Sequence, residues 1–212
     1  DVGMSQEEAE RAVPVGTPVV FRGGCTPLGE GKLCGKAMDD RACFVALLRC
    51  AQLLRDKPLD VDVYFMGSTM EETSSAGAKT GTFALEPDWC VAVDVTHGKT
   101  PDASPKDYTL VLGEGPVIGV GPNCTRWMTE RLKAKAKALE LSYQLEVMPG
   151  HSGTNGWPMQ ISREGVATAV LSLPLRYMHS PIEVLDWKDV EGVAALLAAF
   201  AQDLGKEAET LC

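Results

Sequence analysis

EPDWCVAVDVT, residues 86–96, is the stretch that indicates the fold most clearly. Its central run, residues 89–93, is apolar at every position, as expected for a strand that is covered on both faces. A second run of this kind is VATAVLSL at residues 166–173, and a shorter alternating stretch lies at residues 61–65. We therefore predict buried strands over 89–93 and 166–173, and a third strand over 61–65.

Helical patterns alternate with these strands. Apolar residues recur at helical spacing over 40–55 and 124–141, small residues fill 74–85, and Asp186 is a plausible N-cap for a final helix. The side chains expected to face inward from the first two patterns are Phe44, Leu47, Leu48, Ala51, Leu54, Met128, Leu132 and Leu139. Further extended segments are predicted at 108–112, 116–120 and 145–148. This alternation predicts an α/β fold with a mixed, mostly parallel sheet and helices on both faces.

The composition is that of a folded, acidic, soluble protein. Of 212 residues, 45% are hydrophobic and 23% charged, and 20 basic against 29 acidic residues give a net charge of −9. We expect no nucleic-acid or membrane partner, because such surfaces need clustered Lys and Arg. No apolar run approaches the roughly 18 residues of a membrane span. Seven cysteines without a CxxC pair indicate free thiols in a reducing compartment, so a cytoplasmic location is expected.

Four acidic residues and one histidine stand next to the predicted elements. Asp39 precedes the first helix, Glu71 and Glu72 follow the 61–65 strand, Asp94 ends the next strand, and His179 follows the last one. Functional groups of open α/β sheets gather at such strand ends.

Each of these residues also has an ordinary structural interpretation. Asp39 could be an N-cap, Glu71 and Glu72 an exposed helix start, Asp94 a turn former and His179 a loop histidine. Their combination favours another interpretation, because clustered carboxylates repel one another unless a cation lies between them. We predict a divalent metal site suited to zinc, cobalt or manganese.

The stretches that carry these residues resemble the TET-type (tetrahedral) metallo-aminopeptidases, whose members are also labelled glutamyl or deblocking aminopeptidases or endoglucanases. The stretches follow the family's order and cover nearly the whole chain. They are GKAMDDRACFVALL (35–48), MEETSSAGA (70–78), EPDWCVAVDVT (86–96), GEGPVIGVGPN (113–123) and SREGVATAVLSLPLRYMHSPIEVLDWKDVEG (162–192).

The resemblance implies a role for each candidate residue. Asp39 would bridge two metal ions, Glu72 and His179 would bind one of them, and Asp94 would bind the other. Glu71 would be the general base that deprotonates a bridging water for attack on the first peptide bond of a peptide substrate. The family pattern also implies a cis peptide bond after Asp39.

The resemblance further implies a zinc-peptidase-like domain organisation. Residues 1–35 correspond to the tail of an inserted β-rich, dimerisation-type domain. Residues 36–212 correspond to the catalytic α/β domain without its N-terminal portion, so the chain resembles the last three-fifths of a family member. The family's remaining metal ligand is an upstream histidine, and no histidine here precedes Asp39.

Two other histidines and one asparagine need separate interpretations. We do not expect His151 to replace the upstream ligand, and a loop or substrate-cleft position is favoured for it. His97 follows the strand that carries Asp94, and we expect no functional role for it. Asn155 stands where many family members have the aspartate of a GTD-type stretch.

Three functional hypotheses follow. The leading one is a dinuclear metal-dependent aminopeptidase, with two zinc, cobalt or manganese ions, that assembles from dimers into a dodecamer. The second is a catalytically silent fragment or pseudo-enzyme that keeps the fold. The third is a glycosidase that uses two carboxylates about 5–10 Å apart; the four scattered tryptophans do not favour it.

Overall fold

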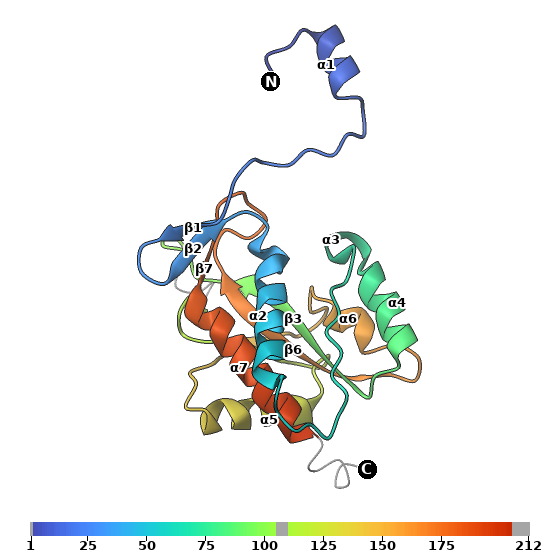
Figure 1. Cartoon of the computed structure of the whole chain (residues 1–212), viewed down its shortest axis with the longest axis vertical. Helices are drawn as coiled ribbons and strands as arrows, with labels where there is room; N and C mark the ends of the chain where they lie inside the picture. Colours follow the sequence, from blue (N-terminus) through green and yellow to red (C-terminus); the bar gives the residue numbers. More distant parts are fainter. Residues whose placement is uncertain (1, 105–109, 205–212) are drawn as a thin grey trace.

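The central element of the structure is a four-stranded sheet (Figure 1). The computed structural model describes residues 2–104 and 110–204. The sheet has the order β3-β6-β4-β5; β3 pairs with β6 and β4 with β5 in parallel, while β4 and β6 are antiparallel. The strands are β3 (Trp89–His97), β4 (Val117–Val120), β5 (Gln144–Val147) and β6 (Ala167–Leu175). The predicted mixed, mostly parallel sheet is thus confirmed.

Helices cover both faces of this sheet, as predicted. One hydrophobic cluster joins the inner sides of α2, α5 and α7 to one face, and a second cluster includes residues of α4 and α6 on the other. Strand β3 shows the alternation, since Val91 and Val93 pack against the first cluster while Cys90 and Ala92 belong to the second. The helices are α2 (Met38–Leu54), α4 (Ala76–Leu85), α5 (Arg126–Ala138), α6 (Gly156–Met159) and α7 (Trp187–Leu204).

A second, three-stranded antiparallel sheet joins residues 26–35 to the strand that directly precedes α7. It consists of β1 (Thr26–Leu28), β2 (Lys32–Gly35) and β7 (Glu183–Asp186) in the order β1-β2-β7. The carboxylate of Asp186 accepts a hydrogen bond from the backbone N–H of Lys188, as the predicted helix cap should. The domain boundary near residue 35 stays a prediction.

The N-terminal arm, residues 2–24, extends away from the rest of the described chain, which we call the body (Figure 1). It contains α1 (Gln6–Ala12), which buries none of its residues. Among the described residues, no helix is long and apolar enough to cross a membrane.

The strand predicted at residues 61–65 does not form. Val61 and Val63 are half-buried and Asp62 and Tyr64 exposed, but Phe65 is exposed as well, and the segment has no strand neighbour in the described part of the chain. The alternation of apolar and polar residues indicates which side chains are covered, whereas a β-strand also requires hydrogen bonds to a neighbouring backbone. Leu110 to Leu112 are likewise not a strand, and the rest of the stretch predicted at 108–112 lies outside the described residues.

The inward faces of two helices were predicted only in part. Met128 and Leu132 of α5 are fully buried, but Leu139, which ends that helix, is 46% exposed. On α2 the buried positions are filled by small residues such as Cys43 and Ala46, while Phe44 and Leu48 are about half exposed. Helical periodicity in α2 is ambiguous because apolar residues occupy both of its sides.

Leu132 and Leu139 offer a matched test of this packing. Leu132→Ala should lower the free energy of unfolding by about 2–5 kcal/mol, because it opens a cavity between α5 and the sheet. Leu139→Ala should change it by less than about 1 kcal/mol. Urea denaturation of both variants measures the difference, and equal losses would contradict the burial described for α5.

Candidate metal centre

Asp39 and Asp40 lie at the start of α2, where the backbone is not helical. Both residues have non-helical dihedral angles, and the peptide bond between them is cis, as the resemblance implied. The preceding Ala37 has a left-handed φ of 54°, which is uncommon for a residue other than glycine. This turn places the Asp39 carboxylate against the segment that carries His179.

Glu71 and Glu72 begin a single helical turn, α3 (Glu71–Ser74). Left-handed residues flank it on both sides, with φ of 60° at Met70 and 52° at Ser75. His179 also has a positive φ, of 63°. Strained backbone of this kind concentrates at functional sites, where the surrounding structure holds it in place.

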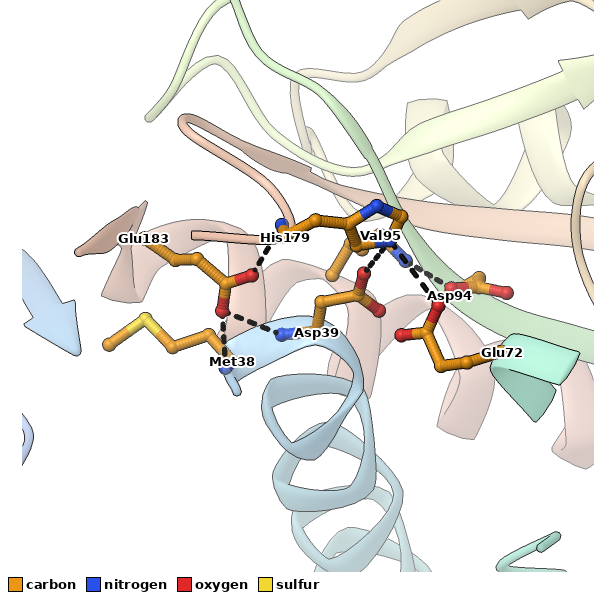
Figure 2. A network of polar contacts seen from close by, with 7 residues as sticks. All are labelled: Met38, Asp39, Glu72, Asp94, Val95, His179 and Glu183. Atoms are coloured by element: carbon orange, nitrogen blue, oxygen red, sulfur yellow. Dashed lines mark hydrogen bonds and ion pairs between the residues drawn. The ribbon is translucent and has the colours of Figure 1, made fainter. Parts of the chain in front are cut away.

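Asp39, Glu72 and His179 converge on one point (Figure 2). The Nε2 atom of His179 lies 3.0 Å from Oδ2 of Asp39 and 3.3 Å from Oε2 of Glu72. A ligand atom from each of the three residues lies within 4.8 Å of the others. Asp39 is almost covered, whereas the side chains of Glu72 and His179 are largely exposed. The cluster therefore opens toward solvent on one side.

Glu183, which is not among the residues predicted from the sequence, holds two sides of this cluster together. Its Oε2 atom accepts hydrogen bonds from the backbone N–H groups of Met38 (2.6 Å) and Asp39 (3.2 Å). Its Oε1 atom accepts one from the backbone N–H of His179 at 2.9 Å (Figure 2). The side chain is fully buried, although a glutamate is rarely buried without partners.

Asp94 and Asp40 form a second carboxylate group around Asp39. One oxygen from each of the three residues lies within 4.8 Å of the other two. Asp94 was predicted to end its strand, but β3 continues to His97, so Asp94 is buried inside β3, where its Oδ1 accepts a hydrogen bond from the backbone N–H of Val95 at 2.8 Å. One oxygen of Asp40 is buried without a hydrogen-bond partner in the described structure.

Burial and mutual repulsion raise the pKa values of these acids. Burial is the main cause in each case, and neighbouring carboxylates add to it. The pKa rises to about 6 for Asp39, about 7 for Asp40 and about 9 for Asp94. The pKa of Glu71 is also raised, by burial and then by the charge of Glu72. Burial and repulsion thus favour neutralisation of these carboxylates, either by bound protons or by another positive charge between their oxygens.

These donors fit a divalent cation. Carboxylate oxygens with one imidazole are ligands that zinc, cobalt and manganese accept. The buried oxygen of Asp40 that has no described hydrogen-bond partner, and the burial of Asp94 beside two other carboxylates, suit a cation at this position. The group around Asp94 contains carboxylates but no imidazole among the described residues, so its ligand set is less complete.

The remaining candidates lie apart from this cluster or beside it. The His151 ring packs on Trp157 with centroids 4.3 Å apart, and its Nδ1 accepts a hydrogen bond from the backbone N–H of Gly153. His97 ends β3 and belongs to neither ligand group. Asn155 donates a hydrogen bond to Oγ of Ser68 at 2.8 Å.

An α/β sheet with clustered carboxylates and an imidazole at its strand ends is typical of metallohydrolases. Comparison with known proteins identifies the group more closely. Residues 1–196 match the M42 glutamyl aminopeptidase family, and the chain belongs to that family.

Named relatives agree with this assignment. The chain is 39% identical to lysyl aminopeptidase of Pyrococcus furiosus over 96% of its own length and 59% of that protein. It is 27% identical to a TET aminopeptidase from a marine-sediment Thaumarchaeota archaeon, with a TM-score of 0.89 and coverage of 98% and 60%.

A further solved structure is the TET1 peptidase of Pyrococcus horikoshii, described as assembling into a tetrahedron or a large octahedral shell. The identity is 26%, the TM-score 0.78, and coverage 96% of this chain and 60% of that one. The chain thus spans about three-fifths of the length of the relatives it matches.

The Glu183 contacts predict a large effect on stability. Glu183→Ala should lower the free energy of unfolding by about 3–5 kcal/mol, because it leaves buried backbone N–H groups without an acceptor. Glu183→Gln should lower the free energy of unfolding by less, since its amide oxygen can still accept a hydrogen bond from a backbone N–H group. Glu191→Ala is the control: its partly exposed contact with Arg49 should contribute about 1 kcal/mol or less. Thermal denaturation compares the three, and a loss no larger than the control's would refute the role of Glu183.

The raised pKa of Asp94 predicts how stability depends on pH without metal. Asp94 binds a proton more tightly in the folded state, so its contribution to stability is present at low pH and is lost as pH rises from about 4 to about 9. Asp94→Asn should flatten this decline, and added zinc or cobalt should restore the stability of the unmodified chain near pH 8. The measurement is the denaturation midpoint from pH 5 to 9, with and without metal; identical profiles for both proteins would rule out this effect.

Proposed function

We propose that this protein is a dinuclear metal-dependent aminopeptidase. The observation that carries the proposal is the convergence of Asp39, Glu72 and His179 within 4.8 Å in a member of the M42 family. In this proposal Asp39 would be a ligand of both ions, Glu72 and His179 would hold one of them, and Asp94 would hold the other. The burial of Asp94 within ligand distance of Asp39 and Asp40 supports its placement beside a cation.

Glu71 is the proposed general base. It follows directly on the left-handed Met70 and lies close enough to Glu72 for that charge to raise its pKa, while burial raises it further. A carboxylate with a raised pKa takes a proton from water more readily at neutral pH and can pass it to the leaving amine. Bound divalent ions would supply Lewis acidity and lower the pKa of that water.

Two features support an exopeptidase that acts on peptides. The cluster is open to solvent at Glu72 and His179, so a peptide end can reach it. The excess of carboxylates gives a free N-terminal ammonium group anionic partners. Zinc and cobalt are the preferred ions and manganese is an alternative, because this mixed oxygen and nitrogen set suits all three.

The proposal also covers the oligomeric state of the protein and its location in the cell. We infer a homo-oligomer built from dimers up to a dodecamer, by analogy with the shell-forming Pyrococcus horikoshii relative. A cytoplasmic location is supported by six cysteines that are unpaired in the described structure.

A catalytically silent protein is the main alternative. The specific observation that favours it is the carboxylate group around Asp94, which has no imidazole among the described residues. The glycosidase hypothesis gains no comparable support, because a histidine lies within 3.3 Å of both Asp39 and Glu72, which suits a metal better than a sugar.

Release of N-terminal amino acids from short peptides tests the proposal. We expect activity that needs added cobalt or zinc and disappears with a chelator. Glu71→Gln should lower turnover about 100-fold or more while metal content stays unchanged. Glu164→Gln, an exposed glutamate outside the described cluster, is the control and should keep full activity.

Each alternative has its own outcome in this assay. Bound metal without peptide hydrolysis in the unmodified chain would support the silent protein. Full activity of Glu71→Gln would remove Glu71 as the base while leaving the peptidase assignment in place.

A further inference from the structure

Polar side chains follow apolar ones along the face of the sheet that α4 and α6 cover. On β3, Ala92 belongs to the second hydrophobic cluster, so Asp94 and Thr96 face the same side. On β6, Val170 belongs to that cluster, and Ser172 therefore faces this side as well. Asp94, Thr96 and Ser172 are all buried. This face of the sheet is thus apolar near the start of β3 and polar beside Asp94.

Ser172 is a buried hydroxyl without a hydrogen-bond partner. The residue is 1% exposed, and its Oγ atom has no partner in the described structure. It pairs in register with Asp94 of the neighbouring strand, so the two side chains are adjacent. The other residues from 169 to 175 are apolar, and a buried polar group without a partner is costly. The hydroxyl therefore indicates a polar ligand on this face of the sheet.

Glu146 reaches the same face from the far edge of the sheet. It lies on β5, which is separated from β3 by the two inner strands β6 and β4. Even so, its Oε1 atom accepts a hydrogen bond from Oγ1 of Thr96 at 2.9 Å. Neighbouring strands lie about 4.8 Å apart, so two side chains can bridge the outer strands only where the sheet is curved. The face is therefore concave here, and the Glu146 carboxylate lies over the inner strands.

The second carboxylate oxygen of Glu146 is available to a ligand. This Oε2 atom is buried and has no hydrogen-bond partner in the described structure. Burial raises the pKa of Glu146, while the hydrogen bond from Thr96 and the charge of His97 lower it. The concave face thus combines a carboxylate oxygen with the hydroxyl of Ser172. Both can accept hydrogen bonds, and a primary ammonium group has three N–H donors to offer them.

We propose that Glu146 and Ser172 bind the side-chain ammonium of an N-terminal lysine, which makes Glu146 a specificity-determining residue. This inference rests on the proposed function, because the first peptide bond of the substrate must lie at the metal centre. Thr96, which holds Glu146, lies two residues beyond Asp94, and two residues of a strand span about 7 Å. The flexible four-carbon stem of lysine can cover such a distance.

The same groups discriminate against other N-terminal residues. An apolar side chain would cover the Glu146 oxygen and the Ser172 hydroxyl without bonding to either, which is costly for buried polar groups. A glutamate side chain would place a second negative charge beside Glu146. Arginine carries a longer, planar guanidinium group in place of a compact ammonium. The geometry therefore favours lysine over all three.

Matched substrates test this preference. The full chain, loaded with zinc or cobalt, is given the p-nitroanilides of lysine, norleucine and glutamate. Norleucine has the four-carbon stem of lysine but lacks the ammonium group. We expect kcat/KM to be at least about tenfold higher for lysine than for norleucine, and lower still for glutamate.

Two variants separate recognition of the ammonium from a structural role. Glu146→Gln keeps an oxygen that can accept from Thr96 but removes the charge. It should lower kcat/KM for lysine by about tenfold or more and change that for norleucine by less than about threefold. Ser172→Ala should shift the ratio in the same direction by a smaller factor. Glu164→Gln, which alters an exposed glutamate, should leave the ratio unchanged.

A binding measurement gives a readout that needs no turnover. Isothermal titration of metal-loaded Glu71→Gln with lysine amide and norleucine amide should show at least about tenfold tighter binding of lysine amide. Adding Glu146→Gln to this variant should abolish the difference.

The outcomes distinguish this inference from the proposed function. Hydrolysis of lysine and norleucine substrates at equal rates would support the peptidase and overturn the role of Glu146. An equal loss for both substrates in Glu146→Gln would also overturn it, because that result reports a structural role. If no substrate is cleaved, the proposed function fails, and the titration alone decides: equal binding of the two amides overturns the inference, and tighter binding of lysine amide supports it.

Discussion

The candidate site depends on one buried carboxylate, that of Glu183. It binds the backbone of Met38 and Asp39 at the start of α2 and the backbone of His179 in the loop after β6. These segments are about 140 residues apart in sequence. Because the hydrogen bonds go to backbone N–H groups, they fix where the main chain lies and leave the side chains of Asp39 and His179 free to bind. A metal site of this kind needs ligands that are held in place before the ion arrives.

Electrostatic repulsion is the opposing constraint. Asp39, Asp40 and Asp94 bring three carboxylates within 4.8 Å, and burial removes the water that would screen them. The hydrogen bonds of Glu183 and the packing of the core hold these carboxylates together against that repulsion. Under the proposed function, cations and protons would compete for the same oxygens, which would couple metal affinity to pH.

Much of the fold and most of the site could be predicted from the sequence. Asp39, Glu72 and His179 were identified because strand ends and family motifs both point to them, and the structure brings them together. Glu183 was missed because its function is to accept backbone hydrogen bonds, and no pattern of residue types reveals which backbone groups will need an acceptor. The strand expected at 61–65 failed for a related reason: the periodicity of one segment cannot show whether another backbone lies beside it.

The N-terminal arm has a consequence for how unfolding of this protein should be measured. Its helix α1 has seven residues, a capping box between Ser5 and Glu8, and no buried side chain. Isolated helices this short are marginal in water, because nucleation costs more than a few hydrogen bonds return. The arm contributes few contacts that are broken on unfolding. The enthalpy of thermal unfolding per residue should therefore be lower than that of a uniformly packed protein of this length. Proteases should also be able to remove the arm from an otherwise intact body.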